Sequence, residues 1–352
     1  MKRIIAICII IIAIPTVAVA YEIPQISGYD MFGETAEGLA AGKLSINPVD
    51  VFNNILSSVS REVKSFSVTA SAILVMALLS STVRTLNMAL GEKASGTAAF
   101  FTFFTVISGL TLNCFWQALT YATEVIGYMT DFMSKLTPAL IITLLACCKT
   151  ASAAAFEPVL STAVLAVSEI IKRCLVPLIT FSAVLSIAGN VGDKNSISGF
   201  VKIVKSVTKW IMTLVITVFT GINTIYGFAS PALDAVGART LKFAVGSLVP
   251  VVGGFLSDTL DTVAASGTVV KNAVGASGIV VIAVICITPI IKIGIMQIMF
   301  KLISAITEPI TDRRISQMLW DMGEAMVAVF GIVVLTAVMF IINICIILNC
   351  TR

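Results

Sequence analysis

The feature that most constrains this chain is a series of long apolar stretches that contain few or no charged residues. Residues 98–119 contain no charged side chain, and several other windows of similar length contain very few. A helix of about twenty apolar residues is long enough to cross the hydrocarbon core of a bilayer. A transmembrane β-barrel would instead show short segments of alternating apolar and polar residues. The pattern therefore predicts an all-α polytopic membrane protein, built as a bundle of transmembrane helices.

The composition agrees with a membrane-embedded chain and argues against several functional classes. Hydrophobic residues make up 58% of the chain and charged residues 12%, whereas about a quarter of the residues of a soluble domain are charged. The net charge of +4 fits cytoplasmic Lys and Arg better than it fits nucleic-acid binding. The sequence has no histidine and no G-x-x-x-x-G-K-[ST] loop, which excludes the histidine-based catalytic motifs and the P-loop. We therefore expect no enzymatic activity, no catalytic residue, no cofactor and no metal site.

The N-terminus has the pattern of a secretory signal peptide. A basic start at residues 1–3 precedes an apolar stretch at residues 4–14, and Ala18 and Ala20 form a small-residue cleavage site before Tyr21. An uncleaved signal anchor is the alternative, but this apolar stretch is short for a membrane span. We expect residues 1–20 to be removed, which would leave the new N-terminus outside the cytoplasm.

The mature chain contains a candidate internal duplication of about 112 residues. Pro138 and Pro250 are 112 positions apart, and so are Pro177 and Pro289. Self-similarity at a fixed period indicates repeated architecture, although chance matches among common residues are the alternative. The predicted divisions are a short extracytoplasmic segment (21–65), a first mature transmembrane helix (66–97), membrane repeat 1 (98–209), membrane repeat 2 (210–321), and a final transmembrane helix and tail (322–352).

Prolines and glycines predict interruptions at corresponding places in the two repeats. The apolar runs 136–148 and 246–257 are short for a membrane span, and each contains a proline. Such interrupted segments occur at matching places in the halves of many transporters. The sequence therefore predicts short broken or re-entrant helices, with breaks at Pro138, Pro177, Pro250, Gly253, Gly254 and Pro289.

Positive charges predict the orientation of the chain and one segment at the membrane surface. Arg84 and Lys93 lie toward the end of the first mature span and should be in the cytoplasm, as should later clusters of Lys and Arg, so both repeats would face the same way. The final span would then end outside. Helical spacing in 200–211 places Phe200, Val204, Val207 and Ile211 opposite Lys202, Lys205 and Lys209. This predicts an interfacial helix whose basic face contacts anionic headgroups, with a docking surface for a cytoplasmic partner as the alternative.

A few ionisable residues in or beside apolar runs are candidates for a polar lining. Asp258 and Asp261 are three residues apart and would share one face of a helix, with Lys271 as a possible partner. Carboxylates in a membrane usually face a bundle interior or a watery cavity, but an exposed loop over 256–272 would explain both aspartates equally well. Three further candidates, Glu169, Lys172 and Arg173, interrupt the apolar run 158–189.

Several long segments of the chain resemble the stage III sporulation protein AE family of endospore-forming bacteria. These are LTPALIITLLACCKTASAAAFEPVL (136–160), GARTLKFAVGSLVPVVGGFLSDTLDTV (237–263), VVKNAVGASG (269–278) and ITEPITDRRISQMLWDMGEAM (306–326). The likeness covers nearly the whole chain and includes the signal peptide. The extracytoplasmic segment is short, which puts any partner contact made there in doubt.

The resemblance implies a place and a role. It implies a multi-pass protein of the mother-cell membrane around the forespore, and a channel or secretion-like complex that links the two cells. The implied partners are other membrane proteins of that complex, among them an ATPase partner and a forespore membrane protein, besides the lipid bilayer. The leading hypothesis is a non-enzymatic component of this channel, for which a permease-like subunit is one form. The alternatives are a scaffold for ring-forming partners that conducts nothing, and a stand-alone secondary transporter.

Overall fold

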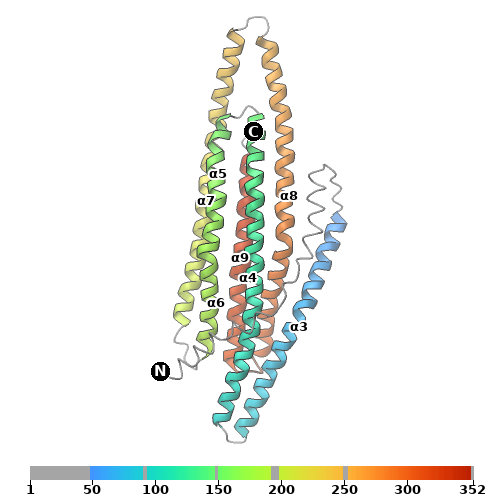
Figure 1. Cartoon of the computed structure of the whole chain (residues 1–352), viewed down its shortest axis with the longest axis vertical. Helices are drawn as coiled ribbons and strands as arrows, with labels where there is room; N and C mark the ends of the chain where they lie inside the picture. Colours follow the sequence, from blue (N-terminus) through green and yellow to red (C-terminus); the bar gives the residue numbers. More distant parts are fainter. Residues whose placement is uncertain (1–47, 90–92, 147–149, 192–197, 249–252, 350–352) are drawn as a thin grey trace. The chain divides into compact units, whose positions relative to one another are not determined.

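The computed structural model of the chain describes residues 48–89, 93–146, 150–191, 198–248 and 253–349. These ranges are helical apart from a short turn at 308–312, which confirms the prediction of an all-α membrane helix bundle. The elements, drawn in Figure 1, are α3 (Pro48–Ala89), α4 (Lys93–Ala146), α5 (Thr150–Ile170), the π-helix η2 (Ile171–Leu175), α6 (Val176–Val191), α7 (Ser198–Leu248), α8 (Gly253–Thr307) and α9 (Arg313–Asn349).

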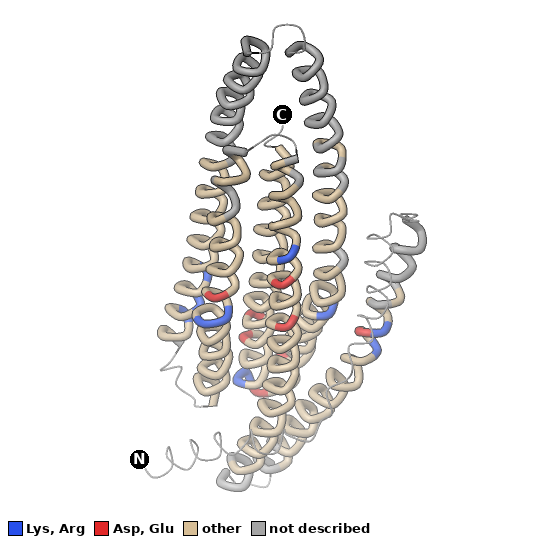
Figure 2. Tube along the Cα trace, turned by 45° about the horizontal axis from the view of Figure 1, so that its top comes forward, with Lys and Arg blue, Asp and Glu red and all other residues tan. Residues whose placement is uncertain are grey.

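Six helical stretches within the described residues are long and apolar enough to cross a membrane. Charged positions are sparse along these stretches, as the tube in Figure 2 shows. The chain is therefore a multi-pass membrane protein. The candidate spans are Val59–Val83, Ala98–Ile142, Ser152–Val191, Gly199–Tyr226, Val274–Thr307 and Arg313–Asn349.

The longest helices exceed what a bilayer can enclose. α4 has 54 residues and α8 has 55, which at 1.5 Å per residue gives each a length of about 80 Å. The hydrocarbon core is about 30 Å thick, and a tilt of up to about 40° lengthens the path through it only to about 40 Å. Parts of α4 and α8 must therefore extend beyond the hydrocarbon layer.

Two of the predicted helix breaks are wrong. Pro138 and Pro289 lie inside the continuous helices α4 and α8, so residues 136–146 are the last part of a long helix and not a separate short one. A proline removes one backbone donor, and membrane helices often compensate with nearby Ser or Thr side chains. Beside Pro138, the Thr137 hydroxyl donates to the Met133 carbonyl at 2.7 Å, one residue before the Ser134 carbonyl that lacks its helical donor.

The helical pattern changes immediately before Pro177. In η2 the Val176 N–H donates to the carbonyl of Ile171, five residues back. Pro177 has no N–H with which to bond the Arg173 carbonyl, so the ordinary α-helical pattern could not continue there. The other predicted breaks flank a gap in the described chain: α7 ends at Leu248, α8 begins with Gly253 and Gly254, and Pro250 lies outside the described residues.

The chain forms two compact units, each of which combines segments that are distant in sequence. Unit 1 draws on the described parts of Met1–Thr120, Thr180–Lys202 and Ile291–Val327. Unit 2 draws on those of Tyr121–Ile179, Ile203–Ile290 and Ala328–Arg352.

Unit 1 contains two helical hairpins whose tips lie at the same end. One hairpin is α3 with the first part of α4, and the other is the last part of α8 with the first part of α9 (Figure 1). Near the tips, the Ser81 hydroxyl of α3 donates to the Ile310 carbonyl at 2.6 Å. Farther along the pair, the rings of Phe66 and Phe300 meet edge to face with centroids 5.5 Å apart. α3 therefore packs beside α8, and in the same direction.

Unit 2 packs through small residues on α8. A side-chain carbon at Gly278 would come within 2.6 Å of Leu136 of α4 and 3.4 Å of Ile344 of α9. On the same side of the helix interface, the Cys286 and Met129 sulfur atoms are 3.0 Å apart. The absence of side chains on such glycines lets membrane helices approach closely.

The predicted divisions of the chain coincide poorly with the helices. α3 begins at Pro48, inside the segment 21–65, and the boundaries at 209 and 321 fall inside α7 and α9. The superposition of 98–209 on 210–321 stays a prediction. The signal peptide also stays a prediction, because residues 1–47 lie outside the described chain.

Candidate functional site

The predicted polar residues on α5 and η2 lie at the surface of unit 2. Glu169 and Arg173 form an ion pair one helical turn apart, and their side chains are 52% and 82% exposed. Lys172 is also exposed, and its ammonium nitrogen lies near Gly127 of α4. The buried face of this helix contains Ile171 and Leu175 instead, so the face with the charged side chains points outward.

The predicted pair on α8 can be placed only by its backbone. Asp258, Asp261 and Lys271 all lie within α8, and their side chains are outside the described ones. The alternative of an exposed loop over 256–272 is wrong, because α8 runs through this range without interruption. That the two aspartates line a cavity stays a prediction.

The predicted basic face lies on the first turns of α7 and not on a separate interfacial helix. Lys202 and Lys209 are exposed and Lys205 is partly buried, but α7 continues without a break to Leu248. Its buried face also differs from the predicted one: Val201, Val204 and Thr208 are buried, whereas Phe200 and Val207 are 51% and 40% exposed. Contacts within the bundle set the buried face here, and the spacing of apolar residues alone does not show them.

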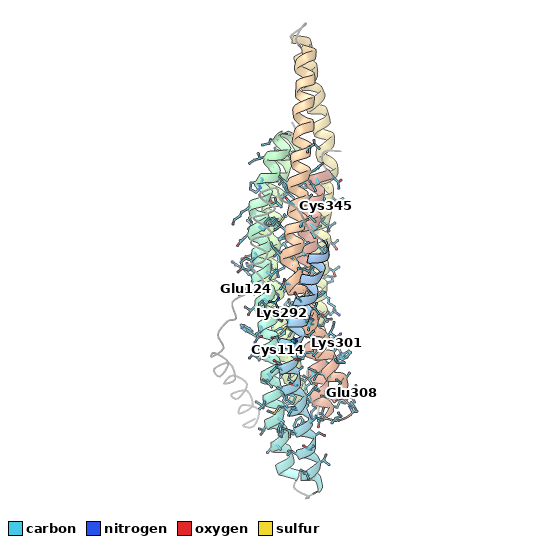
Figure 3. The ribbon with its side chains drawn as sticks, turned by 90° about the vertical axis from the view of Figure 1, so that its right-hand side faces the viewer. Cys114, Glu124, Lys292, Lys301, Glu308 and Cys345 are labelled. Atoms are coloured by element: carbon cyan, nitrogen blue, oxygen red, sulfur yellow. The ribbon has the colours of Figure 1, made fainter. Side chains whose placement is uncertain are left out.

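The structure places other polar groups inside unit 1, and the sequence reasoning missed them. The first is a charge pair between neighbouring helices: Lys292 Nζ of α8 lies 3.8 Å from a Glu62 carboxylate oxygen of α3. The two side chains are only 19% and 23% exposed. Figure 3 shows Lys292 and Lys301 following one another along α8, with Glu308 beyond them in the turn after the helix.

The turn between α8 and α9 is held by a capping aspartate. Asp312 Oδ1 accepts a hydrogen bond from the Arg314 backbone N–H at 3.0 Å, which caps the start of α9. The Arg314 guanidinium donates to both Asp312 carboxylate oxygens, each at 3.2 Å. Its carbon atom lies 3.9 Å from the ring centre of Phe100 in α4, so one arginine ties the turn to the neighbouring hairpin.

Lys301 is held over an aromatic ring of α9. Its ammonium nitrogen lies 5.1 Å from the Trp320 ring centre, a distance at which a cation is attracted to the face of an indole. A side-chain carbon at Gly323 would come within 3.0 Å of Lys301 Cγ. Glycine at 323 therefore leaves room for the aliphatic part of the lysine.

A neutral amide meets a carboxylate deeper in unit 1. Asn190 of α6 donates from Nδ2 to an Asp321 carboxylate oxygen of α9 at 3.0 Å. Asn190 lies in the last turn of α6 and is 5% exposed. Nearby in the hairpin, the Ser304 and Ser316 hydroxyls each donate to the other residue's backbone carbonyl, at 2.9 Å and 3.1 Å.

Apart from the turn residue Asp312, these groups lie in stretches that are apolar enough to cross a membrane. Ionisable groups in such places are costly, and they usually pair with one another and mark a functional pathway. Within the described residues, no group of three acidic or Cys side chains is placed to hold a metal ion. The arrangement can stabilise charge and hold polar groups in an apolar bundle.

One of the missed groups had a visible signal in the sequence. Lys292 is the single charged residue in the run 272–300, and a lone charge in a span is a reason to expect a partner. Asn190 and Asp321 had no such signal, because they are 131 positions apart and no local pattern relates them.

Comparison with known proteins points to one family. The family model described as stage III sporulation protein AE matches residues 31–351. A curated relative described as stage III sporulation protein AE, from Bacillus subtilis (strain 168), is 25% identical over 308 residues, which cover 88% of this chain and 77% of the relative. No solved structure matches the chain.

Proposed function

Because this chain belongs to the stage III sporulation protein AE family, and so has a role in sporulation, we propose that it is a non-enzymatic membrane component of a channel complex between mother cell and forespore. In this proposal the protein sits in the mother-cell membrane that surrounds the forespore. Its partners are the other membrane proteins of the complex, an ATPase partner and a forespore membrane protein. The family resemblance read from the sequence is confirmed, and it supplies the starting point for this proposal.

One observation favours a conducting role within the complex: charged and polar pairs lie inside unit 1, along candidate membrane spans. Lys292 with Glu62, and Asn190 with Asp321, place hydrogen-bonding groups at positions where a bundle held only by packing would place apolar side chains. A permease-like subunit needs such groups along its path, because a polar or charged cargo has to exchange its hydration for protein contacts.

A non-conducting scaffold is the second candidate, and it also has an observation in its favour. Glu62 and Lys292 are partners of each other, and paired charges can simply fix how helices pack. The two functions differ in whether water reaches Lys292. They also differ in whether removal of the Lys292 charge would impair spore formation alone or partner binding as well.

The test combines accessibility with function at Lys292. The chain carrying Lys292→Cys, in membranes from sporulating cells, is treated with a charged methanethiosulfonate that does not cross lipid. We expect Lys292→Cys to be labelled above the level of the parent chain, whose own cysteines include the partly exposed Cys174 and Cys345. Ile293→Cys, whose native residue is fully buried, should add no label. An unreactive Lys292→Cys would contradict a water-filled path.

The functional arm uses Lys292→Gln, which removes the charge and keeps a polar side chain. In a conducting subunit this variant should reach the membrane at the parent level, still co-purify with its partners, and yet give far fewer spores. Loss of spores together with loss of partner co-purification would support the scaffold instead.

A further inference from the structure

α6 carries a buried row of polar side chains that leads to Asp321. Ser182, Ser186 and Asn190 succeed one another at intervals of four residues, so they share one face of the helix. They are 4%, 1% and 5% exposed. The row lies in the candidate span Ser152–Val191, and Asp321 lies in the candidate span Arg313–Asn349.

The end of this row is closely organised. Asn190 Nδ2 donates both to the Ser186 backbone carbonyl at 2.7 Å and to the Asp321 carboxylate at 3.0 Å. Ser186 is one turn before Asn190, and side chains so spaced have Cβ atoms about 5–6 Å apart. The Ser186 hydroxyl therefore lies in the neighbourhood of the Asp321 carboxylate.

The two serine hydroxyls of this row lack a hydrogen-bond partner among the described residues. Other hydroxyls on buried helix faces of the chain bond to the carbonyl one turn back, as Thr111 and Thr130 do at 2.7 Å. A buried hydroxyl without a partner costs about 1–3 kcal/mol. Two of them in one row, beside a carboxylate, indicate that the row is suited to a polar ligand.

The chemistry of the row selects the class of ligand. Its oxygens are one carboxylate, neutral hydroxyls and carbonyls, which are the ligands that hard cations prefer. The row contains one carboxylate, whereas divalent ions in proteins usually recruit several carboxylates or many ligands. We propose that Asp321 and Ser186 bind a monovalent metal cation, Na⁺ or K⁺, between α6 and α9, and that Ser182 is the next polar position along α6.

This inference goes beyond the proposed function, because a conducting subunit and a scaffold could both hold such an ion. It is tested on the purified full-length protein, in detergent or nanodiscs. Thermal unfolding is followed in NaCl, KCl and N-methylglucamine chloride at equal ionic strength, and binding of ²²Na⁺ and ⁸⁶Rb⁺ is measured directly. A cation that binds the folded state stabilises it by RT ln(1 + [L]/Kd). We therefore expect the melting temperature to rise with the concentration of Na⁺ or K⁺ relative to N-methylglucamine, and the bound radioactivity to saturate.

Three variants locate the site. Asp321→Asn should abolish the cation-dependent shift and the bound radioactivity, and Ser186→Ala should weaken both. Glu324→Gln, which changes an exposed acid one turn farther along α9, should keep both at the parent level. In N-methylglucamine chloride, Ser186→Ala should melt no lower than the parent, because it removes a buried hydroxyl that has no protein partner.

Two results would overturn the proposal. Equal melting temperatures in the three salts, with no bound ²²Na⁺ or ⁸⁶Rb⁺, would show that the row holds water only. A cation effect that survives unchanged in Ser186→Ala and Asp321→Asn would place the ion elsewhere. If Asp321→Asn does not accumulate, Ser186→Ala decides, since it removes one oxygen atom and leaves the carboxylate in place. The spore yield of Lys292→Gln tests the proposed function and does not test this cation site, so the two proposals can fail separately.

Discussion

At the scale of single residues, Asp312 and Arg314 fix the start of α9. Asp312 caps the helix and holds the guanidinium of Arg314, and these side chains are only 11% and 23% exposed. Replacing a capping aspartate by alanine typically costs about 1 kcal/mol and up to about 2. We therefore expect Asp312→Ala to lower the melting temperature of the purified protein, and the measurement is thermal unfolding in detergent.

Glu308, in the same turn, supplies the matched control. Its side chain is exposed, and surface substitutions away from special features usually change stability by less than about 0.5 kcal/mol. Glu308→Ala should therefore melt close to the parent protein. Equal losses in the two variants would mean that the turn as a whole, and not the Asp312 cap, carries the effect.

The polar residues show how far sequence reasoning reaches at this scale. The spacing of Glu169 and Arg173 predicts that they share a helix face, and they do pair, but spacing cannot say that this face is exposed. Lys292 stands out as a lone charge, yet its partner Glu62 lies on a helix far away in sequence. Asn190 and Asp321 are brought together only by the packing of α6 beside α9.

At the scale of helices, glycines set how closely α8 approaches its neighbours in unit 2. Gly278 is buried, and a side chain there would overlap Leu136 and press against Ile344. Forcing extra methylene groups into a packed core typically costs about 1–3 kcal/mol. We expect Gly278→Leu to lower the melting temperature in detergent.

Gly109 in α4 is the control for this substitution. Its helix is equally regular, and no atom lies within 4 Å of the place where a side-chain carbon would be. Gly109→Leu should leave stability unchanged or raise it slightly, because leucine favours a helix more than glycine does. A loss at Gly109 as large as at Gly278 would show that the cost is not one of helix contact.

Helices were easier to predict from this sequence than their ends and faces. The apolar run 98–119 indicates a membrane helix, and it lies within α4. The same reasoning placed a break at Pro138 that does not occur, because a long helix held by its neighbours tolerates one missing donor. The buried face of α7 could not be read from its first three turns, since the segments that cover it are distant in sequence.

At the scale of the whole chain, the hairpin tips and the candidate spans together constrain how the protein crosses the membrane. The described residues contain six candidate spans, an even number, so the start of α3 and the end of α9 would lie on the same side. The tips of the two hairpins of unit 1 lie together, as the hydrogen bond from Ser81 to Ile310 shows. Both tips also carry basic residues, among them Arg84, Arg313 and Arg314, so the positive-inside rule predicts that they lie in the cytoplasm.

This orientation predicts a different labelling pattern for the turn and for the C-terminal end. A cysteine at Glu308, an exposed position in the α8–α9 turn, should react with an impermeant maleimide only after vegetative cells that produce the protein are permeabilised. The unsubstituted chain, in which Cys114 and Cys286 are buried but Cys174 and Cys345 are partly exposed, gives the background. Alkaline phosphatase fused after Asn349 should be active, because the end of α9 would lie outside the cytoplasm.

Labelling of Glu308→Cys in intact cells would place the hairpin tips outside. An inactive phosphatase fusion together with a cytoplasmic Glu308→Cys would mean that α9 does not cross, because its two ends would then lie on the same side.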